Sequence, residues 1–221
     1  MPHSRRPLSA HPTRSFVFGI FLVAIFGCTP RVLVRTAPSP APGDWPVYGY
    51  NAGGDRFSPL SQIDRGNVAR LEVAWRFHIG ETAPGFATSA PTALEATPLV
   101  FEGTMYLSTP LGRVFALDPV TGAQRWAFDP GVDRTIRFGD FVNRGVALWV
   151  DTSAAPGAVC RLRIFVSTID ARLISLDGAT GRRCAGFGIE GQVNLKTGLR
   201  NAPANAAESA ARCSWRFHNA H

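Results

Sequence analysis

Two stretches of the sequence carry polar side chains whose types could bind a small molecule. Glu95 begins the stretch Glu95-Ala-Thr-Pro98, and Arg144 lies in a long segment that also contains Asp140 and Asn143. A carboxylate accepts hydrogen bonds, while a guanidinium offers a fixed fork of donors that stabilises negative charge developing on a ligand. Taken by themselves, a carboxylate at a strand end and an arginine on a loop are more typical of a solvated surface and a salt bridge.

The motifs of several common enzyme classes are missing from the sequence. It contains no Gly-rich phosphate loop, no His-Glu-x-x-His and no Gly-x-Ser-x-Gly. His78 is a lone histidine without neighbours at metal-ligand spacing. The residues therefore indicate no P-loop, zinc-protease or α/β-hydrolase chemistry, and they predict no metal site.

Composition favours a globular domain of short elements. Hydrophobic residues make up 45% and charged residues 18% of the 221 residues, and the 22 glycines and 17 prolines favour many turns over long helices. The formal net charge is +7, but Lys196 is the only lysine, and no basic cluster with interleaved aromatic residues occurs. The basic balance is explained as well by coding bias as by function, so we predict no nucleic-acid partner.

The N-terminus is typical of an export signal. Arg5, Arg6 and Arg14 precede an uncharged apolar run over residues 16–27, which is too short to span a bilayer of ~30 Å and which ends at Cys28. The preceding residues resemble a lipoprotein cleavage box, so Cys28 is a lipidation candidate; simple cleavage and an uncleaved anchor remain alternatives. We predict a signal over 1–28, a Pro-rich tether over 29–43, and a periplasmic protein associated with the membrane through its N-terminus.

A sequence repeat predicts the fold. Residues 107–122 align without gaps on residues 166–181 at an offset of 59, with seven of sixteen positions identical. A partial third copy starts at Trp75, where Trp-Arg-Phe matches the Trp-Ala-Phe that starts at Trp126. Repeats with periods of tens of residues indicate units that stack or arrange radially.

Each repeat has the pattern of a four-stranded antiparallel sheet. Short alternating runs are separated by turns such as Asp118-Pro-Val-Thr-Gly122, in which Gly122 supplies a positive φ and the side chains of Asp118 and Thr121 cap backbone N–H groups. We therefore predict an all-β fold, a partial β-propeller of about 2.5–3 blades. The span 129–160 is expected to be an insertion between strands that lines a site, rather than part of a blade.

The order of several motifs resembles one family. The motif Ala116-x-Asp-x-x-Thr-Gly-x-x-x-Trp126 is similar to the tryptophan-docking motif of quinoprotein dehydrogenases, which use pyrroloquinoline quinone (PQQ) in an eight-bladed propeller. Residues 44–49, 56–60 and 63–75 resemble the start of the catalytic domain in the PQQ-dependent glucose and alcohol dehydrogenases, and residues 172–188 resemble the glucose branch. The resemblance covers about residues 44–200, and residues 201–221 look like a tail foreign to the family.

The resemblance implies roles for single residues. Glu95 matches a glutamate that hydrogen-bonds PQQ, and Arg144 matches an arginine that binds its orthoquinone oxygens. Ser167 or Thr168 stands where the family often has a hydroxyl contact, while Asn143 and Asp140 are further candidates in the arginine's loop. The predicted blade-docking residues are Trp45, Trp75 and Trp126. The family's Ca²⁺ ligands, its general-base aspartate and the aromatic residue beneath PQQ have no counterpart in this sequence.

Two cysteines are candidates for a disulfide. Cys160 and Cys184 flank one predicted hairpin, and an oxidising periplasm would permit the bond. Cys28 belongs to the predicted signal boundary, and Cys213 lies in the predicted tail.

These observations together predict the N-terminal part of a periplasmic PQQ-dependent dehydrogenase. It would oxidise a glucose-like sugar or an alcohol and pass electrons to a quinone or cytochrome, and the chain is expected to be inactive alone. An alternative is a cofactor-free propeller lipoprotein that scaffolds outer-membrane protein assembly, and a non-catalytic sugar-binding module is a third hypothesis.

Overall fold

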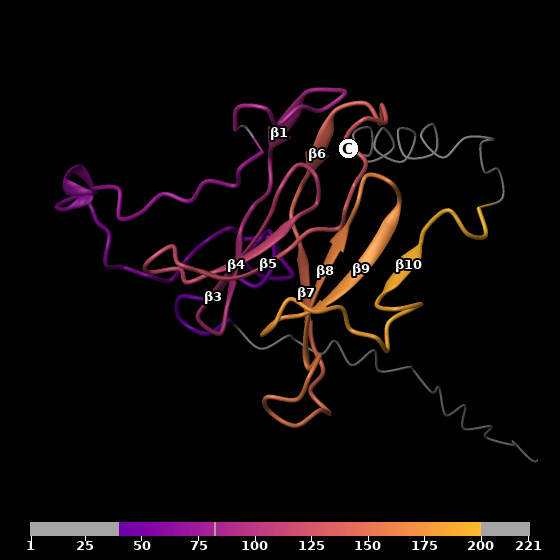
Figure 1. The fold of residues 1–221 in the computed structure, drawn as a ribbon. Helices are drawn as coiled ribbons and strands as arrows, with labels where there is room; N and C mark the ends of the chain where they lie inside the picture. The colour runs from indigo at the N-terminus through magenta and orange to yellow at the C-terminus, as the bar shows by residue number, and fades with distance from the viewer. Residues whose placement is uncertain (1–39, 82, 200–221) are drawn as a thin grey trace, which may run out of the picture. The chain divides into compact units, whose positions relative to one another are not determined.

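The computed structural model describes residues 40–81 and 83–199. The regular elements of this part are short strands and one 3₁₀ turn, η1 (Val68–Arg70), which loops and turns connect, as Figure 1 shows. The predicted signal over 1–28 with Cys28, most of the tether, and the tail over 201–221 lie outside the described residues. The strands are β1 (Thr92–Leu94), β2 (Leu99–Phe101), β3 (Thr104–Ser108), β4 (Val114–Leu117), β5 (Gln124–Phe128), β6 (Phe141–Asn143), β7 (Ala147–Val150), β8 (Leu162–Ser167), β9 (Arg172–Asp177) and β10 (Gln192–Asn194).

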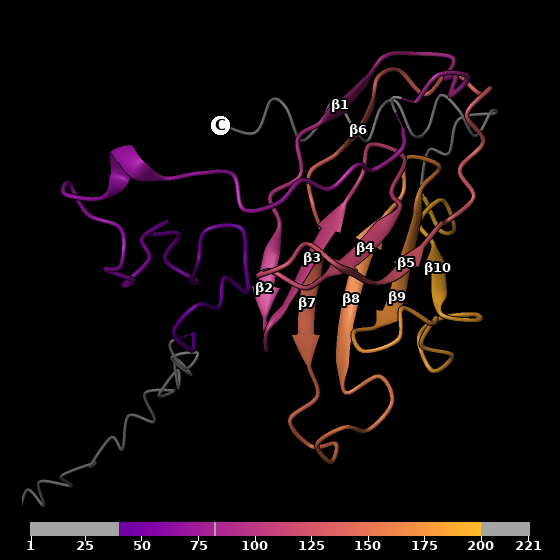
Figure 2. The same ribbon diagram turned by 60° about the vertical axis from the view of Figure 1, so that its left-hand side comes forward.

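Two four-stranded antiparallel sheets correspond to the two full repeats. The first has the order β2-β3-β4-β5 and the second β10-β9-β8-β7, and the strands of both are labelled in Figure 2. In β3 the exposure alternates strictly, with Tyr106 buried between two half-buried neighbours, which is the pattern expected of a strand with one face in a core. The prediction of an all-β fold built from propeller-like units is thus confirmed.

One boundary predicted from the sequence was wrong. The span 129–160 was expected to lie wholly between strands, yet β7 falls inside it and pairs with β8, from Ala147 opposite Phe165 to Val150 opposite Leu162. The four residues of β7 form an almost unbroken apolar run, so the two-residue period that marks a strand is absent from the sequence. Residues 151–161 form the loop that joins β7 to β8.

The turn between β4 and β5 has the predicted chemistry. The Asp118 carboxylate accepts hydrogen bonds from the backbone N–H groups of Val120 and Thr121, both at 2.9 Å, and Gly122 has a φ of +72°. Asp118 also pairs with Arg125 at 3.0 Å. The hydrogen bond from the Thr121 backbone, then those from Arg125 and Val120, lower the pKa of Asp118 from 3.8 to about 2.

Replacing Asp118 with asparagine should change how stability depends on pH. Because the pKa of Asp118 is lower in the folded chain, its stabilising effect is present above the unfolded pKa of 3.8 and is lost as the pH falls toward about 2. The difference in Tm between the wild type and Asp118→Asn should therefore be largest above pH 4 and should shrink between pH 4 and pH 2. A difference that stays constant over this range would contradict the assignment. Circular dichroism melts at several pH values provide the measurement.

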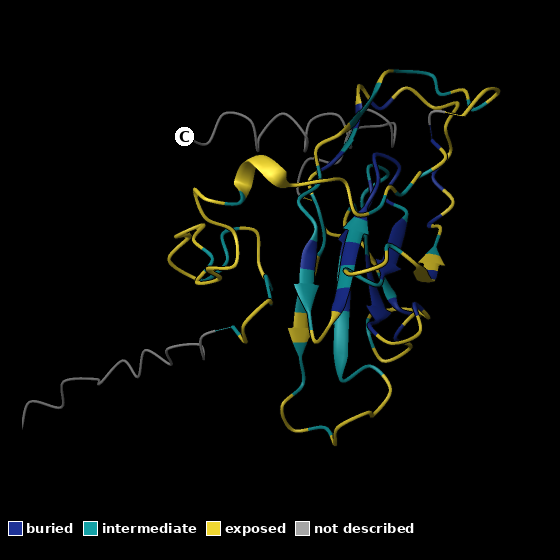
Figure 3. Ribbon diagram, turned by 90° about the vertical axis from the view of Figure 1, so that its left-hand side faces the viewer, coloured by how far each residue is buried: buried dark blue, intermediate teal, exposed yellow. Residues whose placement is uncertain are grey.

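The hydrophobic core lies between the two sheets. Tyr106, Val114 and Trp126 of the first sheet pack against Ile164 and other side chains of the second, and Figure 3 shows the buried segments of the strands. The Trp126 indole N–H donates to the Gly178 carbonyl at 3.0 Å, and the Tyr106 hydroxyl donates to the same oxygen at 3.1 Å. Each sheet therefore buries one face against the other, as neighbouring blades do.

The same tryptophan–glycine contact occurs twice in the described chain. Trp126 packs on Gly181, where an added Cβ would lie 2.5 Å from the indole, and Trp75 packs on Gly122, where a Cβ would lie 2.6 Å from the indole. The Trp75 indole N–H donates to the Pro119 carbonyl at 3.2 Å, just as Trp126 bonds Gly178. Residues 75–79 form no strand in the described chain, but Trp75 contacts the turn of the first sheet as Trp126 contacts the turn of the second.

Candidate functional site

The third sheet brings the candidate site residues together. It consists of β1 and β6, which run parallel with Thr92 opposite Phe141 and Leu94 opposite Asn143. In a parallel pair both strands end on the same side. Glu95 follows the last residue of β1, and Arg144 follows the last residue of β6, so the two side chains emerge next to each other.

Glu95 and Arg144 form an ion pair. The Arg144 Nη2 atom lies 3.1 Å from the Glu95 Oε2 atom. The Glu95 side chain is 40% exposed and the Arg144 side chain is 64% exposed. An ion pair this open contributes at most ~1 kcal/mol to folding, because water screens it. The pair presents a carboxylate and a guanidinium to solvent at one point, and it can exchange contacts with a ligand at little cost to the fold.

Asn143 is buried beside this pair, and its amide is bonded to the protein. The Asn143 Oδ1 accepts from the Ser108 hydroxyl at 2.7 Å and from the Gly145 backbone N–H at 3.0 Å, and its Nδ2 donates to the Ser167 carbonyl at 2.8 Å. Only 8% of Asn143 is exposed. The structure thus places this predicted cofactor residue next to the site, but with its amide directed at both large sheets.

The two hydroxyl candidates have different surroundings. Thr168 is buried, its hydroxyl donates to the Asp170 carboxylate, and it accepts from the Arg172 backbone N–H at 3.2 Å. Ser167 is exposed at the end of β8, where its carbonyl holds Asn143. Of the two, Ser167 has the accessible hydroxyl, whereas Thr168 stabilises the turn between β8 and β9.

Asp140 lies at the other end of β6 from Arg144. It is exposed and directly precedes Phe141, the first residue of the strand. Four extended residues span roughly 13 Å, so the Asp140 backbone is well separated from the ion pair. The structure does not bring this candidate together with Glu95 and Arg144.

A buried carboxylate was missed in the sequence. Glu81 is 3% exposed; it accepts from the Thr109 hydroxyl and from the Leu111 N–H at 3.4 Å, and Arg113 lies 3.9 Å away. Burial raises the pKa of Glu81, against the lowering effect of these partners. Thr109 is the repeat partner of Thr168, whose hydroxyl bonds Asp170. In the second repeat Asp170 supplies the carboxylate that accepts from Thr168. The aligned residue of the first repeat is Leu111, so the first turn lacks its own carboxylate. This difference between the repeats could have revealed Glu81, which accepts from Thr109 instead.

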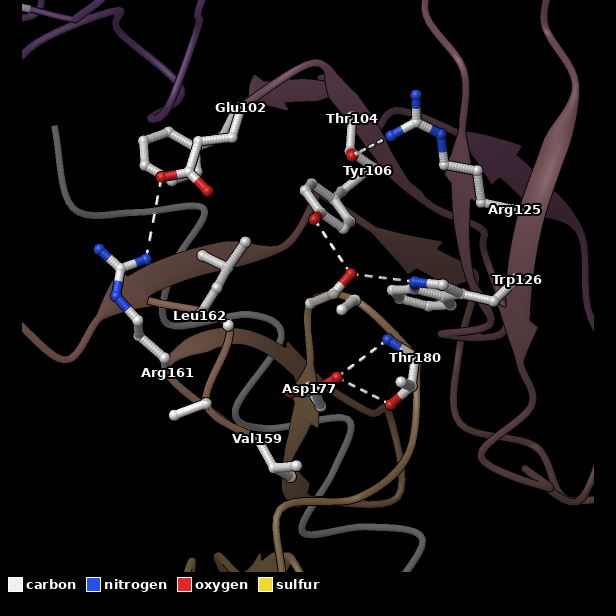
Figure 4. A pocket seen from close by; sticks show the side chains of 15 residues that line it. Glu102, Thr104, Tyr106, Arg125, Trp126, Val159, Arg161, Leu162, Asp177 and Thr180 are labelled. Carbon is white, nitrogen blue, oxygen red and sulfur yellow. Dashed lines mark hydrogen bonds and ion pairs between the residues drawn. The ribbon is translucent and has the colours of Figure 1, made fainter. Parts of the chain in front are cut away.

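A cavity of about 380 Å³ lies between the two large sheets, as Figure 4 shows. It is lined by Thr104, at the start of β3, and Leu162, at the start of β8, whereas the candidate site lies by the ends of these strands at Ser108 and Ser167. Several of its polar groups are bonded within the protein: Asp177, for example, accepts from the Thr180 backbone N–H at 2.9 Å. This cavity is therefore separate from the candidate site.

A disulfide joins Cys160 to Cys184 across 24 positions of sequence. Cys160 lies in the loop between β7 and β8, and its backbone N–H donates to the Asp177 carboxylate at 2.6 Å. Cys184 follows β9, and its backbone N–H donates to the Ser175 carbonyl at 2.9 Å. The bond thus ties the loop to the central strands of the second sheet.

Among residues 40–81 and 83–199, no group of three or more His, Cys, Asp or Glu side chains could hold a metal ion. Over the same part of the chain, no helix has the length and apolar character needed to cross a bilayer.

Comparisons with known proteins point to one family. The family model for the PQQ-type glucose/ethanol/alcohol dehydrogenase β-propeller domain matches residues 45–214. The chain is 34% identical over 188 residues to a quinoprotein glucose dehydrogenase of Gluconobacter oxydans, covering 78% of this chain and 22% of that protein. It is 38% identical over 149 residues to a quinohemoprotein alcohol dehydrogenase of Pseudomonas putida, covering 66% of this chain and 19% of the relative.

A solved structure shows the same likeness. The quinohemoprotein alcohol dehydrogenase of Comamonas testosteroni superposes with a TM-score of 0.54 at 34% identity, over 76% of this chain and 21% of that one. The chain therefore spans about a fifth of the length of the relatives that it matches.

Proposed function

We propose, since this chain belongs to the PQQ-type glucose/ethanol/alcohol dehydrogenase β-propeller family, that it forms part of an oxidoreductase that oxidises the hydroxyl group of a sugar or an alcohol. The observation that carries the proposal is the 3.1 Å pair of Arg144 and Glu95, exposed where β1 and β6 end together. The relatives of the chain are named as glucose and alcohol dehydrogenases, which supports a sugar or an alcohol as the substrate.

The residues of the pair fit PQQ chemically. The cofactor presents two adjacent quinone oxygens and several carboxylates, all hydrogen-bond acceptors, and a pyrrole N–H donor. The Arg144 fork can donate to the quinone oxygens and offset the cofactor's negative charge, while the Glu95 carboxylate can accept from the N–H group. The Ser167 hydroxyl, exposed near Asn143, is the third proposed contact.

In the bound state PQQ would supply the two-electron chemistry that removes hydrogen from the substrate's CH–OH group. Arg144 would hold the cofactor in its orientation and stabilise the negative charge that develops on it. Glu95 would help to hold the cofactor by accepting a hydrogen bond from its N–H group. Neither residue needs to take a proton from the substrate, so their work is binding and electrostatic stabilisation.

We further propose that the general base and the Ca²⁺ ligands belong to blades that the relatives have and that this chain does not span. The chain by itself would then be inactive. A glucose-like sugar or an alcohol is the proposed substrate, and a quinone or cytochrome is the proposed electron acceptor. The proposed location is the periplasm, with the N-terminal segment as signal and Cys28 as the proposed lipidated residue. The exposed carboxylate and guanidinium of this pair favour a cofactor site over a cofactor-free scaffold.

Titration of the purified chain with PQQ tests the site. Arg144→Gln is expected to raise the Kd for PQQ about tenfold or more, because charge-assisted hydrogen bonds of ~1.5–3 kcal/mol are lost. Glu95→Gln, which keeps an acceptor oxygen, should weaken binding less. Quenching of protein fluorescence or calorimetry provides the measurement.

The matched control is Arg125→Gln. This change also removes an arginine from an exposed 3.0 Å ion pair, with Asp118, but on β5 instead of at the proposed site. It should leave the Kd for PQQ within about twofold of the wild type. An unchanged Kd for Arg144→Gln, or a wild-type chain that binds no PQQ, would count against the proposed function.

A further inference from the structure

We infer that Asn143 is a positioning residue, which holds Arg144 beside Glu95. It does so by fastening the corner at the end of β6, residues 143–145, to both large sheets. The inference rests on the proposed function, because it assigns a task within the same site. It also replaces the direct cofactor contact that the sequence suggested for Asn143.

Three hydrogen bonds converge on the Asn143 amide. On one side, Oδ1 accepts from the hydroxyl of Ser108, the last residue of β3 in the first sheet. On the other, Nδ2 donates to the carbonyl of Ser167, the last residue of β8 in the second sheet. The remaining bond, from the Gly145 N–H to Oδ1, fixes the backbone just beyond Arg144. One side chain thus joins both sheets and the corner that carries the guanidinium.

The corner itself has little freedom. Gly145 has a φ of +135°, which side-chain-bearing residues rarely adopt, and a Cβ there would lie 3.3 Å from the Thr97 carbonyl oxygen. Thr97 comes two residues after Glu95, so the corner closes directly on the segment that follows the carboxylate. On its other flank, Asn143 is paired with Leu94 in the parallel register. Arg144 is therefore confined between Asn143, which pairs with β1, and Gly145, which lies against the Thr97 carbonyl.

The chemistry of the site calls for an amide at this position. The oxygen must accept two hydrogen bonds while the opposite atom of the same planar group donates one. An aspartate would supply the acceptors but would turn an oxygen toward the Ser167 carbonyl, and an alanine would leave Ser108, which is fully buried, without its partner. Buried polar groups left without partners are costly, so the corner would be expected to shift or loosen.

The test compares Asn143→Ala and Asn143→Asp with Tyr106→Phe in the full chain. Tyr106→Phe is the matched control, because it also removes a buried hydrogen bond between the same two sheets, at 3.1 Å to the Gly178 carbonyl, but by the cavity and away from the ion pair. The Asn143 variants should raise the Kd for PQQ about tenfold, and Tyr106→Phe should leave it within about twofold. Ser108→Ala, which removes only one of the three bonds, should have a smaller effect than either Asn143 variant.

Hydrogen exchange provides a readout that needs no cofactor. The Gly145 amide loses its acceptor in Asn143→Ala, so peptides covering residues 141–150 should exchange at least tenfold faster in this variant and unchanged in Tyr106→Phe. Unchanged exchange in Asn143→Ala would overturn the inference. So would an equal loss of PQQ affinity in Asn143→Ala and Tyr106→Phe at an equal fall in Tm, since that pattern describes a residue with a purely structural role.

Failure of the inference and failure of the proposed function give different results. If Arg144→Gln weakens PQQ binding and Asn143→Ala does not, the site stands and the positioning role is wrong. If Arg144→Gln has no effect, the proposed function is wrong, and hydrogen exchange at Gly145 alone decides whether Asn143 holds the corner.

Discussion

Trp126→Ala is expected to lower the free energy of unfolding by about 3–5 kcal/mol, the scale of large-to-small changes in a protein core. Trp126 is 9% exposed and packs with Tyr106 and residues of both sheets. Its indole also donates to the Gly178 carbonyl and covers Gly181. The change removes apolar contact and one hydrogen bond at the junction of the two repeats. The two sheets should therefore unfold together at a lower urea concentration.

The control for this change is Trp149→Ala. Trp149 is the same residue type, but it lies on β7, is 47% exposed, and carries Arg163 over its ring. We expect this substitution to cost less than ~1 kcal/mol, because an open side chain loses little buried area. Far-ultraviolet circular dichroism should be followed, since both changes remove a fluorophore. Equal costs for the two substitutions would show that Trp126 does not hold the sheets together.

Removal of the disulfide is expected to have the second-largest effect. With a sequence separation of 24 between Cys160 and Cys184, the loop-closure model gives a loss of about 3.5 kcal/mol when both are replaced by serine. The loop between β7 and β8 would also lose its fastening to β9. Urea unfolding of the double variant and of the wild type, each with and without reductant, measures the effect.

The reductant separates this bond from the other cysteines. The wild type should become about as unstable as the double variant when reductant is added, and the double variant should not change further. A double variant that reductant still destabilises would place the stabilising thiol chemistry at Cys28 or Cys213 instead.

The repeat allowed much of the fold to be predicted from the sequence. The turn at Asp118 forms through contacts two to four residues apart, and such local chemistry is visible in the order of the residues. The docking role of Trp75 and Trp126 was implied by the resemblance to the family's tryptophan-docking motif, which the repeats carry. These elements recur with little change, so one copy predicts the other.

The arrangement of the candidate site could be predicted only in part. The sequence suggested Glu95 and Arg144 through a family resemblance, but the parallel pairing of β1 with β6 joins three-residue strands that are far apart in the chain and show no periodic pattern. The links from Asn143 to Ser108 and Ser167 depend on the packing of two separate sheets. Such contacts arise from tertiary structure, and no local signal encodes them.

The paired tryptophan contacts have a consequence for synthesis of the protein. Trp75 reaches 44 residues forward to Pro119, and Trp126 reaches 52 residues forward to Gly178, so each contact closes with sequence that follows it by one repeat. A chain that emerges N-terminus first can complete the first contact before the second repeat has emerged, and the first sheet can then provide the surface on which the second packs. Assembly of this kind is sequential and directional.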